Sequence, residues 1–184
     1  VASLILDGAG SDTIVAEALG SRRFEVIVRG PGGHSWSDFG TPNPIVVLAQ
    51  AVQAFTQTPV PASPKTTFNI GVIRGGTSVN SIPESASMRV DIRSTSMAEM
   101  ERLEANLRYA IDAAIETAQS NARGGPQKHS YKLSAEVIAI GNRPAGELDA
   151  GARILHVIRA VDAHLGNGSQ IQRASTDANV PLSL

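Results

Sequence analysis

The feature that most constrains the fold is the order in which strand-like and helix-like hydrophobic patterns follow one another through the middle of the chain. Residues 85–93 alternate apolar and polar side chains, as a strand with one buried face does. Three further segments have strand patterns, and apolar residues at helical spacing mark two helices between them. The predicted strands are residues 22–29, 67–74, 85–93 and 131–140. The sequence therefore predicts the order strand, helix, strand, strand, helix, strand.

Both predicted helices have a start signal. Asn43 precedes the first helix as an N-cap, and Pro44 occupies its first position. Ser96 and Glu99 form a capping box at the start of the second helix. Four strands with two helices on one face make an α+β, ferredoxin-like βαββαβ sandwich. The outward positions of the strands are polar, which fits an antiparallel sheet with one solvated face.

The two ends of the chain do not fit this pattern. Residues 3–6 form a short apolar run that ends at Asp7, and an all-apolar strand is expected inside a parallel sheet. Beyond the fourth strand the pattern changes to a further helix and then a polar segment. We expect the middle of the chain to be a complete domain, and the apolar run without a surrounding sheet indicates truncation. The three parts are residues 1–21, 22–141 and 142–184.

The composition excludes several classes of partner. The net charge is −1 and 18 % of the 184 residues are charged, so we expect neither nucleic acid nor an anionic membrane as a partner. The apolar runs are too short to span a bilayer, and the first residues do not resemble a signal peptide. The absence of cysteine excludes disulfides and thiolate metal sites. It permits a reducing compartment, and we expect a cytoplasmic location.

The candidate chemistry centres on one loop. The glycine-rich segment 30–33 is followed by His34 and Trp36, but it lacks the Lys-Ser/Thr pair of a phosphate-binding loop. A glycine-rich turn explains the glycines and leaves the imidazole and the indole unexplained, which favours a functional loop. The sequence has no His-x-Asp, His-Glu-x-x-His or Glu-Glu motif and no Gly-x-Ser-x-Gly elbow. It therefore lacks the usual motifs of a complete metal or serine hydrolase site.

Three motifs resemble a known family. They are residues 30–35 (Gly-Pro-Gly-Gly-His-Ser), 76–83 (Gly-Thr-Ser-Val-Asn-Ser-Ile-Pro) and 90–93 (Val-Asp-Ile-Arg). In this order they are similar to the lid, or dimerisation, domain of the zinc aminopeptidase/carboxypeptidase/aminoacylase family. That family includes tripeptide aminopeptidase, carboxypeptidase G and the succinyl-diaminopimelate desuccinylases. The resemblance covers nearly the whole chain and implies a lid inserted into a catalytic domain, with the outer segments as stubs of that domain.

The resemblance implies a homodimer in which two lids pair side by side. His34 would reach into the partner's active site and stabilise the oxyanion of a tetrahedral intermediate, an effect worth roughly 3–4 kcal/mol. Asn80 would hold the substrate, and Arg93 and Arg173 would bind its carboxylate. Thr176 and Asp177 would line the substrate site in the segment that returns to the catalytic domain. The substrate would be a peptide or an N-acyl amino acid.

The same resemblance implies two zinc ions in the parent enzyme, with Asp7 as one ligand. The family's other zinc ligands and its general base have no counterpart in this sequence, so we expect this chain to bind no zinc and to be inactive alone. One alternative is a free-standing ferredoxin-like module that binds or senses a small molecule. Asp7 and the segment 173–179 argue against it, because such a module has no use for them. A third reading, an enzyme with unfamiliar chemistry, depends on His34 and Asp38.

Overall fold

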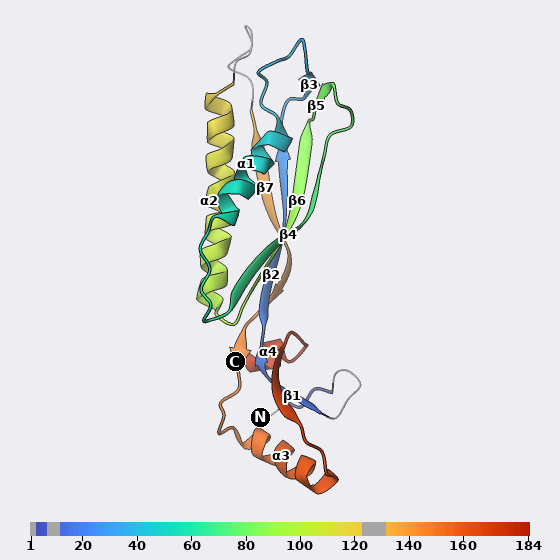
Figure 1. Cartoon of the computed structure of the whole chain (residues 1–184), viewed down its shortest axis with the longest axis vertical. Coiled ribbons are helices and arrows are strands. Elements are labelled where there is room, and N and C mark those ends of the chain that lie inside the picture. The colour runs from blue at the N-terminus through green and yellow to red at the C-terminus, as the bar shows by residue number, and fades with distance from the viewer. Residues whose placement is uncertain (1–2, 7–11, 123–131) are drawn as a thin grey trace.

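The computed structural model describes residues 3–6, 12–122 and 132–184. Figure 1 shows an elongated molecule, with the longest helices and strands at one end and a smaller group of elements at the other. The strands are β1 (Thr13–Ala18), β2 (Gly20–Arg29), β3 (Gly33–His34), β4 (Thr66–Gly75), β5 (Ser81–Ile82), β6 (Ser85–Ser94), β7 (Ser134–Arg143), β8 (Gly146–Glu147) and β9 (Gln170–Ala174). The helices are α1 (Pro44–Thr56), α2 (Met97–Ser120), α3 (Arg153–Leu165) and α4 (Asn179–Leu182).

The main sheet has the strand order β4-β6-β2-β7, and every neighbouring pair is antiparallel. Helices α1 and α2 lie together on one face of this sheet (Figure 1). The predicted α+β class, the βαββαβ order and the placement of both helices on one face are therefore confirmed. The fourth strand is displaced from its predicted position, since β7 covers Ser134–Arg143. Tyr131, where that strand was predicted to begin, lies outside the described residues.

One hydrophobic core fills the space between the main sheet and the two helices. Phe24, Val26 and Val28 are the inward side chains of β2, and all three are buried. The rings of Phe55 on α1 and Phe68 on β4 pack with centroids 4.7 Å apart. Both predicted caps are formed, because Asn43 Oδ1 accepts the amide of Ile45 and Ser96 Oγ accepts the amide of Glu99. No helix within the described ranges is long and apolar enough to cross a membrane.

A smaller sheet at the other end of the molecule has the order β8-β1-β9. Its strands β1 and β9 are parallel, with Thr13 opposite Gln170, and β1 and β8 are antiparallel. The chain passes between the two sheets twice, from β1 to β2 and from β7 to β8. Helix α3 follows and buries Leu155, while much of its apolar face is exposed. This sheet was not predicted.

The prediction of a strand at residues 3–6 is wrong. The structure gives these residues no regular secondary structure, and Leu4 and Leu6 are 65 % and 91 % exposed. A strand forms only where another strand can pair with its backbone, and no strand in the described part of the chain pairs with this run. Apolar composition alone was therefore misleading here.

Candidate functional site

Two loops meet at the end of the main sheet that carries β3 and β5. His34 is opposite Ser81 in the short ladder between these strands, and the amide of Ser35 donates to the carbonyl oxygen of Asn80 at 2.9 Å. Gly33 has φ 149°, and a Cβ there would lie 2.9 Å from the Cβ of Asp38. A glycine is needed at this point because the chain turns closely around the Asp38 side chain. His34 and Asn80 are thus brought together, as neighbours on facing loops.

Asp38 shapes the loop and does not engage the imidazole. Its Oδ2 accepts the backbone amide of His34 at 2.7 Å and the hydroxyl of Ser37 at 3.2 Å, and its own amide donates to the carbonyl oxygen of His34 at 3.0 Å. A catalytic carboxylate would instead contact a ring nitrogen. The reading in which His34 and Asp38 form a catalytic pair has no support in this arrangement.

The imidazole of His34 is exposed and is oriented by its own loop. Its Nδ1 accepts the backbone amide of Trp36 at 3.2 Å. In a neutral imidazole one nitrogen accepts and the other carries the proton, so this bond places the proton on Nε2. Nε2 has no hydrogen-bond partner among the described residues and is the donor that a ligand would meet. Trp36 itself is 88 % exposed beside it.

Asn80 is also exposed. Its Oδ1 accepts the hydroxyl of Ser78 at 2.5 Å, which leaves the side-chain amide protons for another partner. The neighbouring Val79 is fully exposed. This end of the molecule therefore presents an imidazole donor, an amide donor and exposed apolar side chains together.

Arg93 lies near the other end of β6, where it is opposite Ser21 on β2 and Thr67 on β4. Its Nε donates to Asp91 Oδ2 at 2.6 Å, and Arg23 Nε donates to the other oxygen of Asp91 at 2.8 Å. Partial burial raises the pKa of Asp91, but the hydrogen bonds and positive charges of Arg93 and Arg23 outweigh it, so the pKa is lowered overall. Asp91 thus stays ionised and orients Arg93 through Nε, which leaves the two terminal nitrogens of the guanidinium free of this bond.

Three further predicted site residues lie in or after β9, namely Arg173, Thr176 and Asp177. Arg173 is in the strand itself, where its Nε donates to Glu17 of β1 at 2.6 Å. Asp177 is 3.8 Å from Arg143 and its side chain is 88 % exposed. Ser21 pairs with both Arg93 and Arg143, so Arg93 and the arginine that contacts Asp177 lie on either side of the same β2 residue.

Asn179 is a residue that sequence reasoning missed. Its side chain is buried and donates to the carbonyl oxygens of Leu19 at 2.9 Å and Pro144 at 2.8 Å. Its Oδ1 accepts the amide of Thr176 at 2.8 Å. These bonds fasten the segment around Thr176 to both points at which the chain passes between the two sheets. The partners are backbone groups remote in sequence, so no local pattern indicates them.

The predicted site residues therefore form two groups at opposite ends of the main sheet. Arg93 lies eight residues after Ser85 along β6, and β5 ends at Ile82, shortly before Ser85. At about 3.4 Å per residue the two groups are roughly 27 Å apart. Figure 1 shows β3 and β5 at one extreme of the main sheet, far from β1 and α4. One copy of the chain does not bring His34 and Asn80 to Arg93 and Arg173.

The described residues do not form a metal site. Among residues 3–6, 12–122 and 132–184, no three His, Cys, Asp or Glu side chains are grouped as metal ligands. Asp7 lies outside the described residues, so its role as a zinc ligand stays a prediction. The part of the chain that the structure describes does not fit a two-zinc site.

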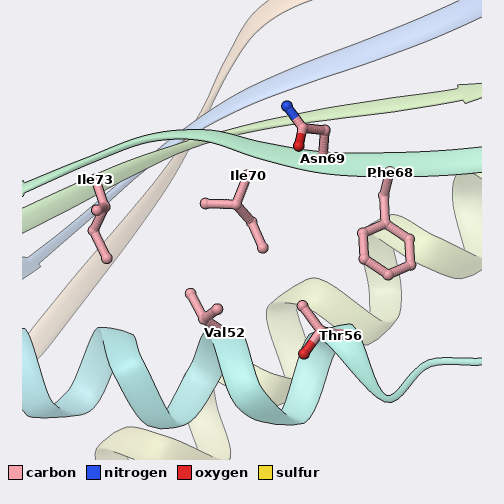
Figure 2. A pocket seen from close by; sticks show the side chains of 6 residues that line it. All are labelled: Val52, Thr56, Phe68, Asn69, Ile70 and Ile73. Atoms are coloured by element: carbon pink, nitrogen blue, oxygen red, sulfur yellow. The ribbon is translucent and has the colours of Figure 1, made fainter.

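An apolar groove runs along the edge of the main sheet between α1 and β4. Figure 2 shows Val52 and Thr56 of α1 facing Phe68, Ile70 and Ile73 of β4 across it. The groove has a volume of about 390 Å³. Since β4 is the outermost strand, no other strand of residues 3–6, 12–122 and 132–184 pairs with its outer backbone edge. This edge combines apolar side chains with free strand hydrogen-bonding groups.

Comparisons with known proteins agree with the fold. A probable carboxypeptidase from Ajellomyces capsulatus is 36 % identical over 85 residues, covering 40 % of this chain and 20 % of that protein. Aminopeptidase PepT from Bacillus cereus superposes with a TM-score of 0.72 at 22 % identity, covering 95 % of this chain and 44 % of that one. An aminobenzoyl-glutamate utilization protein from Klebsiella pneumoniae gives a TM-score of 0.67 at 21 % identity, covering 94 % and 43 %.

The two structural matches are below 25 % identity and show a shared fold. The chain spans less than half the length of each of these three proteins. The sequence profile of the peptidase dimerisation domain matches residues 17–118, which is more than half of the chain. The chain therefore belongs to the peptidase dimerisation domain family.

Proposed function

We propose that this chain is the lid of a dimeric zinc peptidase or amidohydrolase and that each active site of the parent enzyme is built from two subunits. The observation that carries the proposal is the separation of the two groups of site residues by roughly 27 Å along β6. A substrate of peptide size cannot contact both groups of one copy. In a dimer with a twofold axis, the His34 end of one lid can lie next to the Arg93 end of the other, so that both groups contact one substrate.

In this scheme His34 supplies a hydrogen bond to the developing oxyanion. The bond from the Trp36 amide to Nδ1 supports this role, because it sets the tautomer that donates from Nε2. A donor fixed in place before the reaction costs little reorganisation when the charge develops. Asn80 is on the facing loop and donates a second hydrogen bond to the substrate.

Arg93 and Arg173 bind the substrate carboxylate at the other end. Arg93 is held through Nε by Asp91, so its terminal nitrogens are presented to a ligand in a fixed orientation. Arg173 is held by Glu17 through Nε and one terminal nitrogen, which leaves its other terminal nitrogen for the substrate. Thr176 and Asp177 contribute from the adjoining segment. A peptide or an N-acyl amino acid has the carboxylate that this pair of guanidinium groups would select.

The second copy would occupy the edge formed by α1 and β4. Antiparallel pairing of two β4 strands would extend the main sheet across the dimer and cover the free strand edges. The apolar groove seen in Figure 2, together with the exposed Ile73 and Ile45, would be buried by the same contact. This surface offers both backbone hydrogen bonds and apolar area, which the association of a second copy needs.

The zinc ions of the parent enzyme would be held by residues other than those described here. Bound zinc would supply an activated water at neutral pH. The described residues of this chain would bind and orient the substrate and stabilise the oxyanion. We expect the chain alone to hydrolyse no peptide and to bind no zinc stoichiometrically, and we keep the cytoplasmic location as a prediction.

Subunit complementation in the full-length parent enzyme tests the two-chain site. The variants His34→Ala and Arg93→Ala should each be inactive as homodimers. When they are mixed and allowed to exchange subunits, half of the dimers are mixed and each has one intact site, so activity should return to about a quarter of wild type. If all site residues came from one chain, every site in the mixed dimer would carry a defect. No recovery after verified exchange would therefore reject the proposal.

A further inference from the structure

A second hollow lies on the open face of the main sheet, away from α1 and α2. It is bounded by the end of β4, the start of β6, the middle of β2 and the β3–β5 ladder, and its volume is about 590 Å³. That size is within the range of small-molecule sites, about 300–1,000 Å³. Its lining includes the side chains of Ile27 and Ile82, the hydroxyls of Thr77 and Ser87, and the charged groups of Arg74 and Glu84.

Arg74 differs from the other arginines of the same sheet face. Arg23 and Arg93 pair with Asp91, Arg89 pairs with Glu25, and Arg29 pairs with Glu136. Arg74 has neither an ion pair nor a hydrogen bond to its side chain within the described ranges. It is opposite Ser87 in the β4–β6 ladder, so its backbone is fixed at the wall of the hollow. One guanidinium group on this face is thus left for a ligand.

Glu84 is the matching unpaired carboxylate. Its carbonyl oxygen accepts the amide of Gly30 at 2.9 Å, and it follows the buried Pro83. A Cβ added at Gly32 would lie 2.6 Å from Glu84 Cγ, so the Glu84 side chain rests directly against that glycine. The carboxylate has no ion-pair partner in the part of the chain that the structure describes, and it does not pair with Arg74. Glu25 also lines the hollow, but its carboxylate pairs with Arg89. The hollow therefore contains one unpaired positive and one unpaired negative group among the described residues.

We propose that this hollow binds a free α-amino acid or a dipeptide as its zwitterion. Arg74 would bind the carboxylate and Glu84 the ammonium group, since each charged group attracts the opposite charge of the ligand. Thr77 and Ser87 would supply neutral hydrogen bonds. Ile27 and Ile82 would contact an aliphatic side chain. Ligands that lack either charge would leave one of the two protein groups without its partner.

The site is distinct from the proposed two-chain active site. Its charged residues are not among those placed on the oxyanion or on the substrate carboxylate, although Gly33 and Ser81 lie next to His34 and Asn80. Binding here needs one copy of the chain and no hydrolysis. A negative ligand titration would therefore not change the outcome of the complementation experiment. A negative complementation experiment would likewise not exclude ligand binding in the hollow.

The test is a titration of the 184-residue chain followed by two-dimensional NMR, with L-leucine and alanyl-alanine as probes. Saturable shifts should appear at the amides of residues 74–87. N-acetyl-leucine lacks the ammonium group and leucinamide lacks the carboxylate, and each should bind at least about tenfold more weakly. Arg74→Gln and Glu84→Gln should each weaken leucine binding by a similar factor.

Two variants control for a general loss of charge. Arg159→Gln and Glu116→Gln change exposed side chains on α3 and α2, outside the hollow, and should bind leucine like wild type. Circular dichroism should show all four variants folded, because the four side chains are exposed. The proposal is overturned if neither leucine nor alanyl-alanine gives a saturable shift at tens of millimolar. It is equally overturned if the acetylated and amidated ligands bind as well as leucine, or if the hollow variants bind like the controls.

Discussion

The side-chain amide of Asn179 donates to the carbonyl oxygen of Leu19 at 2.9 Å, across 160 residues of sequence. Leu19 is the single residue between β1 and β2, and the second acceptor, Pro144, stands between β7 and β8. One buried carboxamide therefore joins both connections between the main sheet and the smaller sheet. Gly146 allows the same close packing, because a Cβ there would lie 2.1 Å from the carbonyl oxygen of Leu182. The junction is fixed by specific contacts on both sides.

Replacing Asn179 with Ala should loosen this junction. The change removes three hydrogen bonds and leaves two partly buried carbonyl oxygens without this partner, with a cost of roughly 2–4 kcal/mol. Hydrogen exchange should become faster in β1 and β9, while the amides of α2 keep their protection. Asn142→Ala, at an exposed position on β7, is the matched control and should leave exchange unchanged. Equal protection of β1 and β9 in both variants would show that the carboxamide does not hold the junction.

The α1–β4 edge should govern association of the chain. Ile73→Glu places a charge at the exposed border of the groove, where a second copy would have to bury it without a partner. Sedimentation equilibrium should show a dimer for wild type and a monomer for this variant. Ile138→Glu makes the same change on β7, the opposite edge strand, where Ile138 is similarly exposed, and should remain a dimer. A monomer produced by the β7 variant alone would place the interface at the other edge.

The main sheet could be predicted because its signals are local. Alternation along β2 and β6, and the caps at Asn43 and Ser96, each act within a few residues of where they appear. The smaller sheet could not be predicted in this way. In its parallel pair β1–β9, Glu17 lies opposite Arg173, which is 156 residues away in the sequence. Nothing in the sequence of either strand indicates which strand it pairs with. Apolar residues 3–6 gave a strong local signal, yet no strand of the described chain pairs with them.

The candidate site also has one part that local sequence motifs predict and another part that they do not. The resemblance implied roles for both His34 and Asn80 toward the substrate, and the hydrogen bond from Ser35 to Asn80 joins their loops. Their distance from Arg93 could not be read from the motifs, because it depends on which end of β6 each loop joins. Asn179 was not predicted, because its hydrogen-bond acceptors are backbone carbonyl oxygens that are remote in the sequence. The partners of a hydrogen-bonding side chain can be predicted from the sequence only when they are a few residues away, as in a helix cap.

Asp91 should make stability depend on pH in the acid range. Its pKa is lowered in the folded state from 3.8, so its contribution is fully present above that value and is lost as the pH falls through the lower folded pKa. Urea midpoints for wild type and Asp91→Asn should therefore differ by a constant amount near neutral pH. The difference should shrink as the pH falls below about 4, where the wild-type carboxylate takes up its proton. A difference independent of pH down to full protonation would mean that the charge of Asp91 contributes nothing.

His34 should affect the chemical step in the full-length parent enzyme. If Nε2 stabilises the oxyanion, His34→Ala removes a bond that is strongest in the transition state, so kcat should fall about 10²–10³-fold with little change in KM. His156→Ala changes an exposed histidine on α3 and should leave both constants unchanged. The variant should still dimerise, because His34 is at the tip of the sheet and away from the α1–β4 edge. A rise in KM with kcat unchanged would assign His34 to substrate binding and remove it from the catalytic step.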